Sequence, residues 1–232
     1  MSWTHRLLSP SRADNYLQYL KGVVHNFPDA PEYTEEMFID KILGRDLGNI
    51  IKMQAGTATH SVFEKRVSAN GHTFVEGDSF RHNKWLINFE HTFEIDYPPV
   101  REFWVRGSIG EFPIGGKVDA GSGTCAHDLK TTGNINIETY MESCQWKMYC
   151  LVGGFDKFVY DILKVDVNEE EFIVTIKDYQ RLELHPYPTM RDEITEILDE
   201  YNSLLLALHP KILARIDELE AQGIKIDRSK FI

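Results

Sequence analysis

The sequence predicts an α/β domain, and three observations point to that class. The chain has 232 residues, of which 42% are hydrophobic, so it can form one large core. Apolar residues follow helical spacing in residues 1–71 and 181–232. Residues 72–180 instead hold short aromatic and β-branched segments broken by Gly, Pro and Asn, together with one helical stretch. No internal repeat or low-complexity linker separates these parts, so we expect a single domain over residues 1–232.

Three helices are expected in the first part of the chain. Residues 9–25 place apolar side chains at helical spacing, and Ser9 or Ser11 is the candidate N-cap. Residues 34–47 repeat the pattern. A third helix is expected to begin near Gly56 and to end by Gly71, because glycine often marks a helix boundary.

The middle of the chain predicts a sheet with one helix, and its end predicts another helix. Short segments of strand composition are residues 72–77, 84–90, 91–97, 102–109, 156–166 and 170–179. Residues 115–133 predict a hairpin with a glycine-rich turn, and residues 137–152 return to helical spacing. The final helix is expected to bury an apolar stripe made of Met190, Ile194, Ile197, Leu198, Tyr201, Leu204, Leu205 and Leu208.

Net charge limits the ways in which this chain could meet an anionic substrate. Its value of −11 argues against binding nucleic acid through the overall field of the protein. A local basic surface or a bound metal would be needed instead. Candidates for that surface are Lys52, Lys65, Arg66, Arg81, Lys84, Arg101, Arg106, Lys117 and Lys147. Trp85, Trp104 and Trp146 could stack on unpaired bases, although core packing is the commoner role of tryptophan.

Cysteine usage and hydropathy indicate a cytoplasmic protein without a membrane anchor. Cys125, Cys144 and Cys150 are odd in number and lack CxxC spacing, so we expect reduced cysteines in or near the core. Apolar runs such as residues 204–208 are far shorter than the roughly 20 residues that span a bilayer. The amino terminus lacks the long apolar stretch of a signal peptide.

The predicted hairpin, GGKVDAGSGTCAHDLKTTG, carries the residues with the clearest chemistry. Asp128 and Lys130 are two apart on a strand and therefore share a face, and the turn can bring Asp119 beside them. Converging carboxylates repel each other, and a divalent cation relieves that repulsion. Magnesium suits such oxygen ligands. A cation there could stabilise charge on a phosphodiester, with the lysine orienting the attacking water.

An acidic residue two positions before a lysine is too common to identify a site by itself. A solvated charge ladder on an exposed strand would have the same spacing. Further residues at helical spacing lie on either side of the hairpin. His60 and Glu64 are four apart in GTATHSVFE, and Gln145 and Tyr149 are four apart in QWKMY.

The order GTATH, GGKVD, DLKTT and QWKMY resembles the RecB-like branch of the PD-(D/E)XK nuclease superfamily, which includes phage recombination exonucleases and CRISPR-adaptation nucleases. The motifs span residues 56–149, and SPSRADNYLQYL resembles the first helix of that branch. The resemblance implies a restriction-endonuclease-like core, in which helices flank a mixed central sheet, with helical N- and C-terminal segments. Relatives with an iron-sulfur cluster use four cysteines, so this chain resembles the cluster-free members, and it shows no helicase motifs.

Residue roles follow from the resemblance position by position. Asp119, Asp128, the backbone carbonyl of Leu129 and His60 would hold Mg²⁺ or Mn²⁺. Lys130 would position or activate the attacking water. The remaining motif residues are Gln145 and Tyr149, which would support the site or contact the DNA backbone, and Glu64, which would either orient a water or be a surface carboxylate.

The resemblance favours a metal-dependent DNA exonuclease in phage-type recombination, repair or DNA processing. DNA would be the substrate, a recombination or single-strand annealing protein would be a further partner, and a phage-encoded chain would work in the host cytoplasm. Strand preference and oligomeric state are left open.

Three alternatives belong to other classes of protein. A phosphate-binding loop would need glycine at Glu111 and a hydroxyl residue at Val118. A zinc enzyme using Cys125, His127 and Cys144 lacks the HxE and PCxxC pattern of the zinc deaminases. A catalytically silent nucleic-acid-binding or assembly module with the same fold would retain the architecture without the chemistry, and intact motif residues argue against it.

Overall fold

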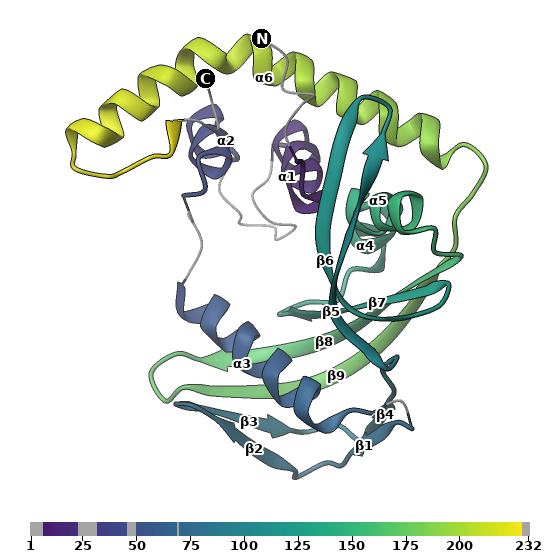
Figure 1. The fold of residues 1–232 in the computed structure, drawn as a ribbon. Coiled ribbons are helices and arrows are strands. Elements are labelled where there is room, and N and C mark those ends of the chain that lie inside the picture. The colour runs from purple at the N-terminus through teal and green to yellow at the C-terminus, as the bar shows by residue number, and fades with distance from the viewer. Residues whose placement is uncertain (1–6, 23–31, 46–49, 69, 229–232) are drawn as a thin grey trace. The chain divides into compact units, whose positions relative to one another are not determined.

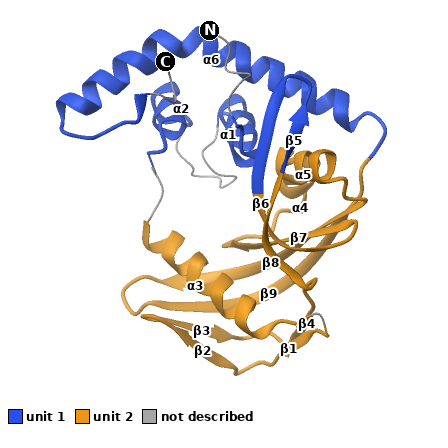
Figure 2. Ribbon diagram, viewed as in Figure 1, with its two compact units in different colours: residues 1–47, 106–116, 187–232 blue, residues 48–105, 117–186 orange. Residues whose placement is uncertain are grey.

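A computed structural model of the chain describes residues 7–22, 32–45, 50–68 and 70–228 (Figure 1). Its internal contacts divide the chain into two compact units (Figure 2). Unit 1 comprises residues 1–47, 106–116 and 187–232, and unit 2 comprises residues 48–105 and 117–186. The predicted site residues from His60 to Tyr149 all belong to unit 2.

The main sheet has seven strands in the order β2-β3-β9-β8-β7-β6-β5. It is mixed, because β3 pairs with β9 and β7 with β8 in parallel, whereas β2–β3, β6–β7 and β8–β9 are antiparallel. β1 and β4 form a separate antiparallel pair. The strands are β1 (His72–Phe74), β2 (Ser79–His82), β3 (Trp85–Phe89), β4 (Phe93–Ile95), β5 (Val100–Ile109), β6 (Phe112–Ser122), β7 (Cys125–Thr132), β8 (Lys157–Asn168) and β9 (Ile173–Leu184).

Six helices accompany these strands in the described part of the chain: α1 (Pro10–Leu20), α2 (Glu35–Ile42), α3 (Ile50–Arg66), α4 (Ile137–Glu142), α5 (Cys144–Gly153) and α6 (Met190–Ala221). In unit 2, α3 crosses one face of the sheet and packs on β2, β3, β7 and β9 (Figure 1). Ala58, Val62 and Phe63 of this helix are buried against sheet residues such as Ile87 and Leu129. The helix α5 packs on β8. The α/β class, with helices flanking a mixed central sheet, is confirmed.

The predicted start of the third helix was wrong, and the reason bears on the site. α3 begins at Ile50, so Gly56 lies inside the helix and does not mark its start. A Cβ atom at Gly56 would lie only 3.2 Å from Thr131 Oγ1 of β7. The glycine therefore lets the helix approach the sheet closely. Gly71 does follow the helix end, with a φ of +81°.

The other helices match the predictions with shorter limits. α1 and α2 lie inside the ranges 9–25 and 34–47, of which residues 23–25 and 46–47 fall outside the described part. Thr34 caps α2 by accepting the Met37 N–H. The range 137–152 contains two helices, because Ser143 leaves the helical conformation with ψ 135° and caps the second helix through the Gln145 N–H.

The strand pattern holds with one omission. The short strand β2, SFRH, was missed because it is partly exposed and three of its four residues are polar. The hairpin of β6 and β7 and the two long strands β8 and β9 occur where they were predicted. The sequence did not show that β3, β7, β8 and β9 form two parallel pairs.

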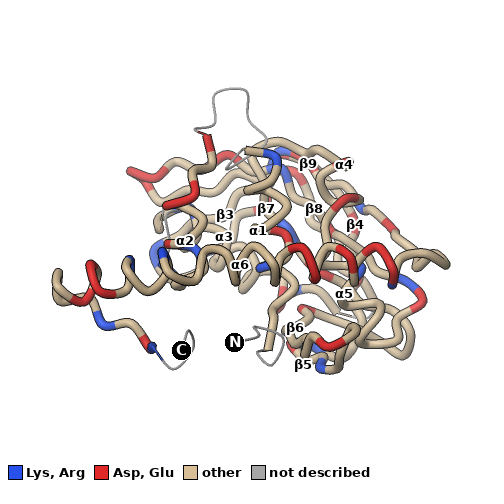
Figure 3. Tube along the Cα trace, turned by 90° about the horizontal axis from the view of Figure 1, so that it is seen from above, with Lys and Arg blue, Asp and Glu red and all other residues tan. Residues whose placement is uncertain are grey.

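The described part of unit 1 contains the helices α1, α2 and α6 and strand residues within 106–116. Helix α6 has a buried stripe along its whole length. The buried residues are Met190, Ile194, Leu198, Tyr201, Leu205, Leu208, Ile212, Ile216 and Leu219. Ile197 and Leu204, which were predicted to join the stripe, are half-buried. Carboxylates recur along this helix (Figure 3). No described helix is both long enough and apolar enough to span a lipid bilayer.

Candidate active site

The β6–β7 hairpin changes its pairing where the predicted site begins. Its register runs from Ser122↔Cys125 to Ala120↔His127, after a turn in which Gly123 has a φ of +51°. After the last paired position, the Leu129 N–H of β7 donates to Asp119 Oδ2 of β6 at 2.9 Å, so a side chain takes the place of a backbone acceptor. A carboxylate is thereby fixed at the point where backbone pairing ends.

Asp128 and Lys130 share a face of β7, as their spacing predicted. Lys130 Nζ lies 2.6 Å from Asp128 Oδ2, and it also lies 5.7 Å from the centroid of the Tyr160 ring on β8. Asp128 pairs in register with Tyr160, so the tyrosine ring lies on the same face of the sheet as the ammonium. Asp128 Oδ2 is nevertheless a buried oxygen without a hydrogen bond of good geometry in the described chain.

His60 reaches this hairpin from α3. Its Nδ1 lies 3.7 Å from Asp119 Oδ2, one helical turn after the close approach at Gly56. Burial lowers the pKa of His60, and the nearby Asp128 carboxylate only partly opposes that effect. A neutral imidazole is the form that binds metal ions.

Asp119 experiences the strongest electrostatic perturbation among these residues. Burial raises its pKa to about 7, with further raising by Asp128, while the Leu129 N–H and Lys130 act in the opposite direction. The side chain is still 33% exposed, so solvent reaches the carboxyl group. Two carboxylates that compete for ionisation in this way form a site that favours a cation or a proton.

Gln145 and Tyr149 come to the site from α5. The Tyr149 hydroxyl donates to the Lys117 carbonyl of β6 at 2.9 Å and is hydrogen-bonded by the Gln145 side chain. Burial, followed by the nearby Asp128 charge, raises the Tyr149 pKa to about 12. These two residues therefore fix the strand two positions before Asp119.

Glu64 lies at the margin of the site. It is exposed, and burial of its carboxyl group together with Glu102 raises its pKa, while Lys117 and Arg101 lower it. Its charge also contributes to the raised pKa of Asp119. The structure thus gathers His60, Asp119, Asp128 and Lys130 closely and places Glu64 beside them.

The donor atoms at this site fit a hard divalent cation in kind. Two carboxylates, a neutral imidazole and the Leu129 carbonyl match the ligands of Mg²⁺ or Mn²⁺. No group of three or more His, Cys, Asp or Glu side chains converges in ion-binding geometry within the described residues. At this site the reason is visible, because Lys130 holds the Asp128 carboxylate. The buried Asp128 Oδ2 contacts the Lys130 ammonium but makes no hydrogen bond of good geometry in the described chain, so it keeps capacity to bind a cation.

Two tyrosines near Lys130 were missed by sequence reasoning. Tyr160 was hidden because only the parallel pairing of β7 with β8 places it under Lys130. Tyr140 on α4 stacks obliquely on Tyr160 with ring centroids 5.3 Å apart and hydrogen-bonds Thr132. Burial raises the Tyr140 pKa, and the Lys130 charge opposes this. Neither residue belongs to a sequence motif that could have marked it.

The opposite face of β7 carries a buried polar network. His127 Nδ1 lies 3.3 Å from Asp161 Oδ2, and Asp161 Oδ1 accepts hydrogen bonds from Tyr179 Oη at 2.7 Å and Arg181 Nε at 2.9 Å. Arg181 Nη1 continues to Asp96 Oδ1 at 2.6 Å. Because His127 Nδ1 contacts the Asp161 carboxylate, the structure gives no support to a zinc enzyme that uses Cys125, His127 and Cys144.

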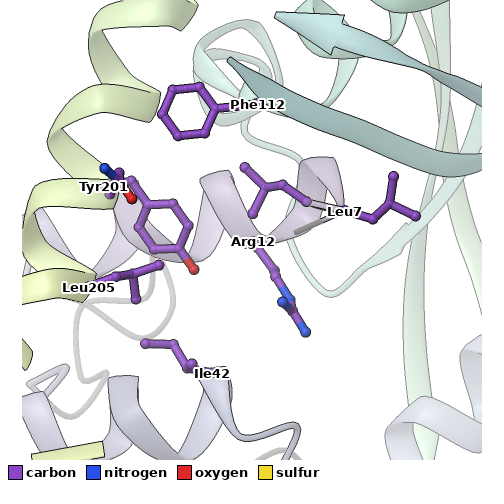
Figure 4. Close-up of a pocket in the computed structure, with 8 residues that line it drawn as sticks. Leu7, Arg12, Ile42, Phe112, Tyr201 and Leu205 are labelled. Atoms are coloured by element: carbon purple, nitrogen blue, oxygen red, sulfur yellow. The ribbon is translucent and has the colours of Figure 1, made fainter. Parts of the chain in front are cut away.

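Unit 1 contains a hollow of its own. Its lining is Leu7, Leu8, Arg12, Ile42, Phe112, Tyr201, Asn202 and Leu205 (Figure 4). The volume is about 30 Å³, which is the room of a single water molecule. Asn202 Oδ1 is a buried acceptor without a partner in the described chain, and one water would satisfy it.

Comparisons with known proteins identify structural likenesses only. No family model and no curated protein matches the chain. Three solved structures are similar to it. SSO0001 is 14% identical, and the match covers 85% of this chain and 76% of that chain with a TM-score of 0.43. LHK-Exo in complex with dAMP is 12% identical, with 93% of this chain and 94% of that chain covered and a TM-score of 0.40, and a candidate exonuclease from Eubacterium rectale is 13% identical, with 97% and 85% covered in the same order and a TM-score of 0.47. Likeness at this level assigns neither a family nor an activity.

Proposed function

We propose that this protein is a metal-dependent deoxyribonuclease that hydrolyses phosphodiester bonds at the Asp119–Asp128–Lys130 site. The observation that carries the proposal is the convergence of two carboxylates, an ammonium and a neutral imidazole where β6 and β7 part. The raised pKa of Asp119 supports it, because it marks a site in need of positive charge.

Asp119, Asp128, the Leu129 carbonyl and His60 would hold the Mg²⁺ or Mn²⁺ ion. When bound, such an ion supplies Lewis-acid stabilisation of the charge that develops on the phosphate. Lys130 has three N–H donors, so it can hold Asp128 and still orient a water toward phosphorus. Tyr160 limits the positions open to the ammonium.

Gln145 and Tyr149 act as positioning residues in this proposal. Their hydrogen bonds to each other and to the Lys117 carbonyl hold β6 in place, and Asp119 follows two residues later. Loss of the tyrosine hydroxyl would loosen the strand that carries the first carboxylate.

The finer assignment rests on the motif order from GTATH to QWKMY. It supports a PD-(D/E)XK enzyme of the RecB-like branch that acts as an exonuclease in recombination, repair or DNA processing. A phage-type recombination or single-strand annealing protein would be the fitting partner, with DNA as substrate.

A time course on labelled DNA tests this function. The parent protein is incubated with linear and circular DNA, single- and double-stranded, with magnesium, with manganese and with a chelator. The proposal expects shortened products from linear DNA in the presence of either metal and none with the chelator. Intact DNA under every condition, with equal DNA affinity of the parent and Lys130→Ala, would favour the silent binding module instead.

A further inference from the structure

A group of exposed cations in unit 2 lies outside the candidate site. Lys65 and Arg66 end helix α3, and Arg81 and Lys84 belong to the β2–β3 hairpin against which that helix packs. We call these four residues the basic edge, because β2 is the outermost strand of the sheet. All four side chains are exposed.

Three members of the basic edge contact rings. None of its members has a carboxylate within ion-pair distance in the part of the chain that the structure describes. Arg66 instead stacks over the Phe80 ring at 3.6 Å, Lys84 Nζ lies 4.0 Å from the Phe172 ring centroid, and Lys65 Nζ lies 3.4 Å from His82 Nδ1. Other cations of unit 2 are neutralised, among them Lys157 by Glu183 and Lys177 by Glu90.

The aromatic contacts also hold these charges in place. A guanidinium stacked on a ring and an ammonium above another ring lose less freedom when they bind an anion than free side chains would. Glu76 and Asp78 lie in the turn before β2, and Asp78 is occupied as an acceptor for the Val75 N–H. Residues 64–84 contain four basic residues and three acidic ones, Glu64 among them, so this segment has a formal charge of +1 in a chain whose net charge is −11.

We propose that the basic edge binds the phosphate backbone of DNA beyond the cleaved bond. This inference rests on the proposed nuclease function, because it assigns the substrate of the same site a second contact. Helix α3 carries residues of both the candidate site and the basic edge. Lys65 and Arg66 follow His60 by five and six residues, or about 8–9 Å along the helix. Successive phosphates of one strand are about 3.4 Å apart along duplex DNA, so Lys65 and Arg66 lie about two to three nucleotides from the cleaved bond. Strand β2 is four strand positions from β7, or about 19 Å, which corresponds to about six nucleotides.

Binding measured in a chelator separates this contact from catalysis. Fluorescence anisotropy of labelled linear DNA gives the affinity of the parent, of Arg81→Ala/Lys84→Ala and of the control Lys157→Ala/Lys177→Ala, at several salt concentrations. The control removes the same two charges from paired positions. The edge variant should bind about tenfold more weakly at low salt, and its log-log salt slope should be shallower by about 1.5, while the control matches the parent.

The possible outcomes separate the two proposals. Equal loss in both double variants, or no loss in either, would overturn the role of the basic edge even if the parent cleaves DNA. A selective loss in the edge variant supports the edge, and if the parent then never cleaves DNA, only the nuclease proposal fails. Unchanged melting temperatures of both variants would show that neither result reflects unfolding.

Discussion

The two faces of strand β7 carry polar residues in opposite states. On one face His127 belongs to a network in which Asp161 is fully buried and receives hydrogen bonds from Tyr179 and Arg181. On the other face Asp128 is almost as deeply buried, yet one of its oxygens lacks a well-formed hydrogen bond.

This difference separates a structural role from a functional one. Buried polar groups are normally satisfied, and a satisfied network strengthens the fold. A buried carboxylate that is held only by a nearby ammonium, beside a second carboxylate of raised pKa, keeps capacity for a ligand. We therefore expect substitutions on the two faces to break different properties of the protein.

Lys130→Ala should give the largest effect, on turnover. Removal of one donor that stabilises charge in a transition state typically costs about 10²–10³-fold in rate. We expect a loss of at least that size in kcat on DNA, with the far-UV circular dichroism spectrum unchanged. Lys157→Ala, on the neighbouring strand β8, is the matched control and should retain parental turnover. A Lys130 variant as active as this control would remove the lysine from the mechanism.

Asp161→Ala should act on stability. It deletes a fully buried acceptor that Tyr179 and Arg181 share, so Tyr179 loses its carboxylate and Arg181 keeps only Asp96. Breaking a buried charge pair from one side typically costs about 3–5 kcal/mol. Urea unfolding should show a lower midpoint with a similar slope. If Asp161→Ala unfolded like the parent but lost activity, the division between the two faces would be wrong.

Asp119→Asn should have a smaller effect, one that depends on pH. Burial and Asp128 raise the Asp119 pKa from 3.8 to about 7, so its contribution to stability is fully present below pH 3.8 and is lost as the pH rises through about 7. Asparagine can still accept the Leu129 N–H and carries no charge. Without metal, the free energy of unfolding of the variant relative to the parent should increase by about 1 kcal/mol as the pH rises from 5.5 to 8.5. This corresponds to about 2–4 °C in melting temperature.

The comparison of parent and Asp119→Asn at each pH isolates this group from the other titrating residues. Thermal melts in a chelator would give the two curves. A constant difference in melting temperature between parent and variant across that pH range would mean that folding does not raise the pKa of Asp119.

The elements that have strong local patterns could be predicted from the sequence. The apolar stripe of α6, the hairpin of β6 and β7, and the facing pair of Asp128 and Lys130 all follow from periods of 3.6 or 2 residues. The start of α3 could not be found, because Gly56 resembles a helix boundary and serves close packing against Thr131.

The parts of the site that depend on strand order were also hidden. Tyr160 reaches Lys130, and Asp161 reaches His127, only because β8 lies parallel to β7 in one particular register. Long-range pairing of that kind leaves no local trace in the sequence. The exposure of Trp104, in contrast to the buried Trp85 and Trp146, likewise required the fold.

Calorimetric titration of Mn²⁺ into the DNA-free protein would show whether Asp119 and Asp128 form a cation site. We predict saturable binding by the parent, binding weakened about 10–100-fold by His60→Ala, and no measurable binding by Asp119→Asn, with all three proteins folded. Asp161→Asn, on the other face of the sheet, should bind like the parent if it folds. Equal Mn²⁺ affinity of the parent and Asp119→Asn, or no binding by the parent, would contradict the assignment of a cation site to Asp119 and Asp128.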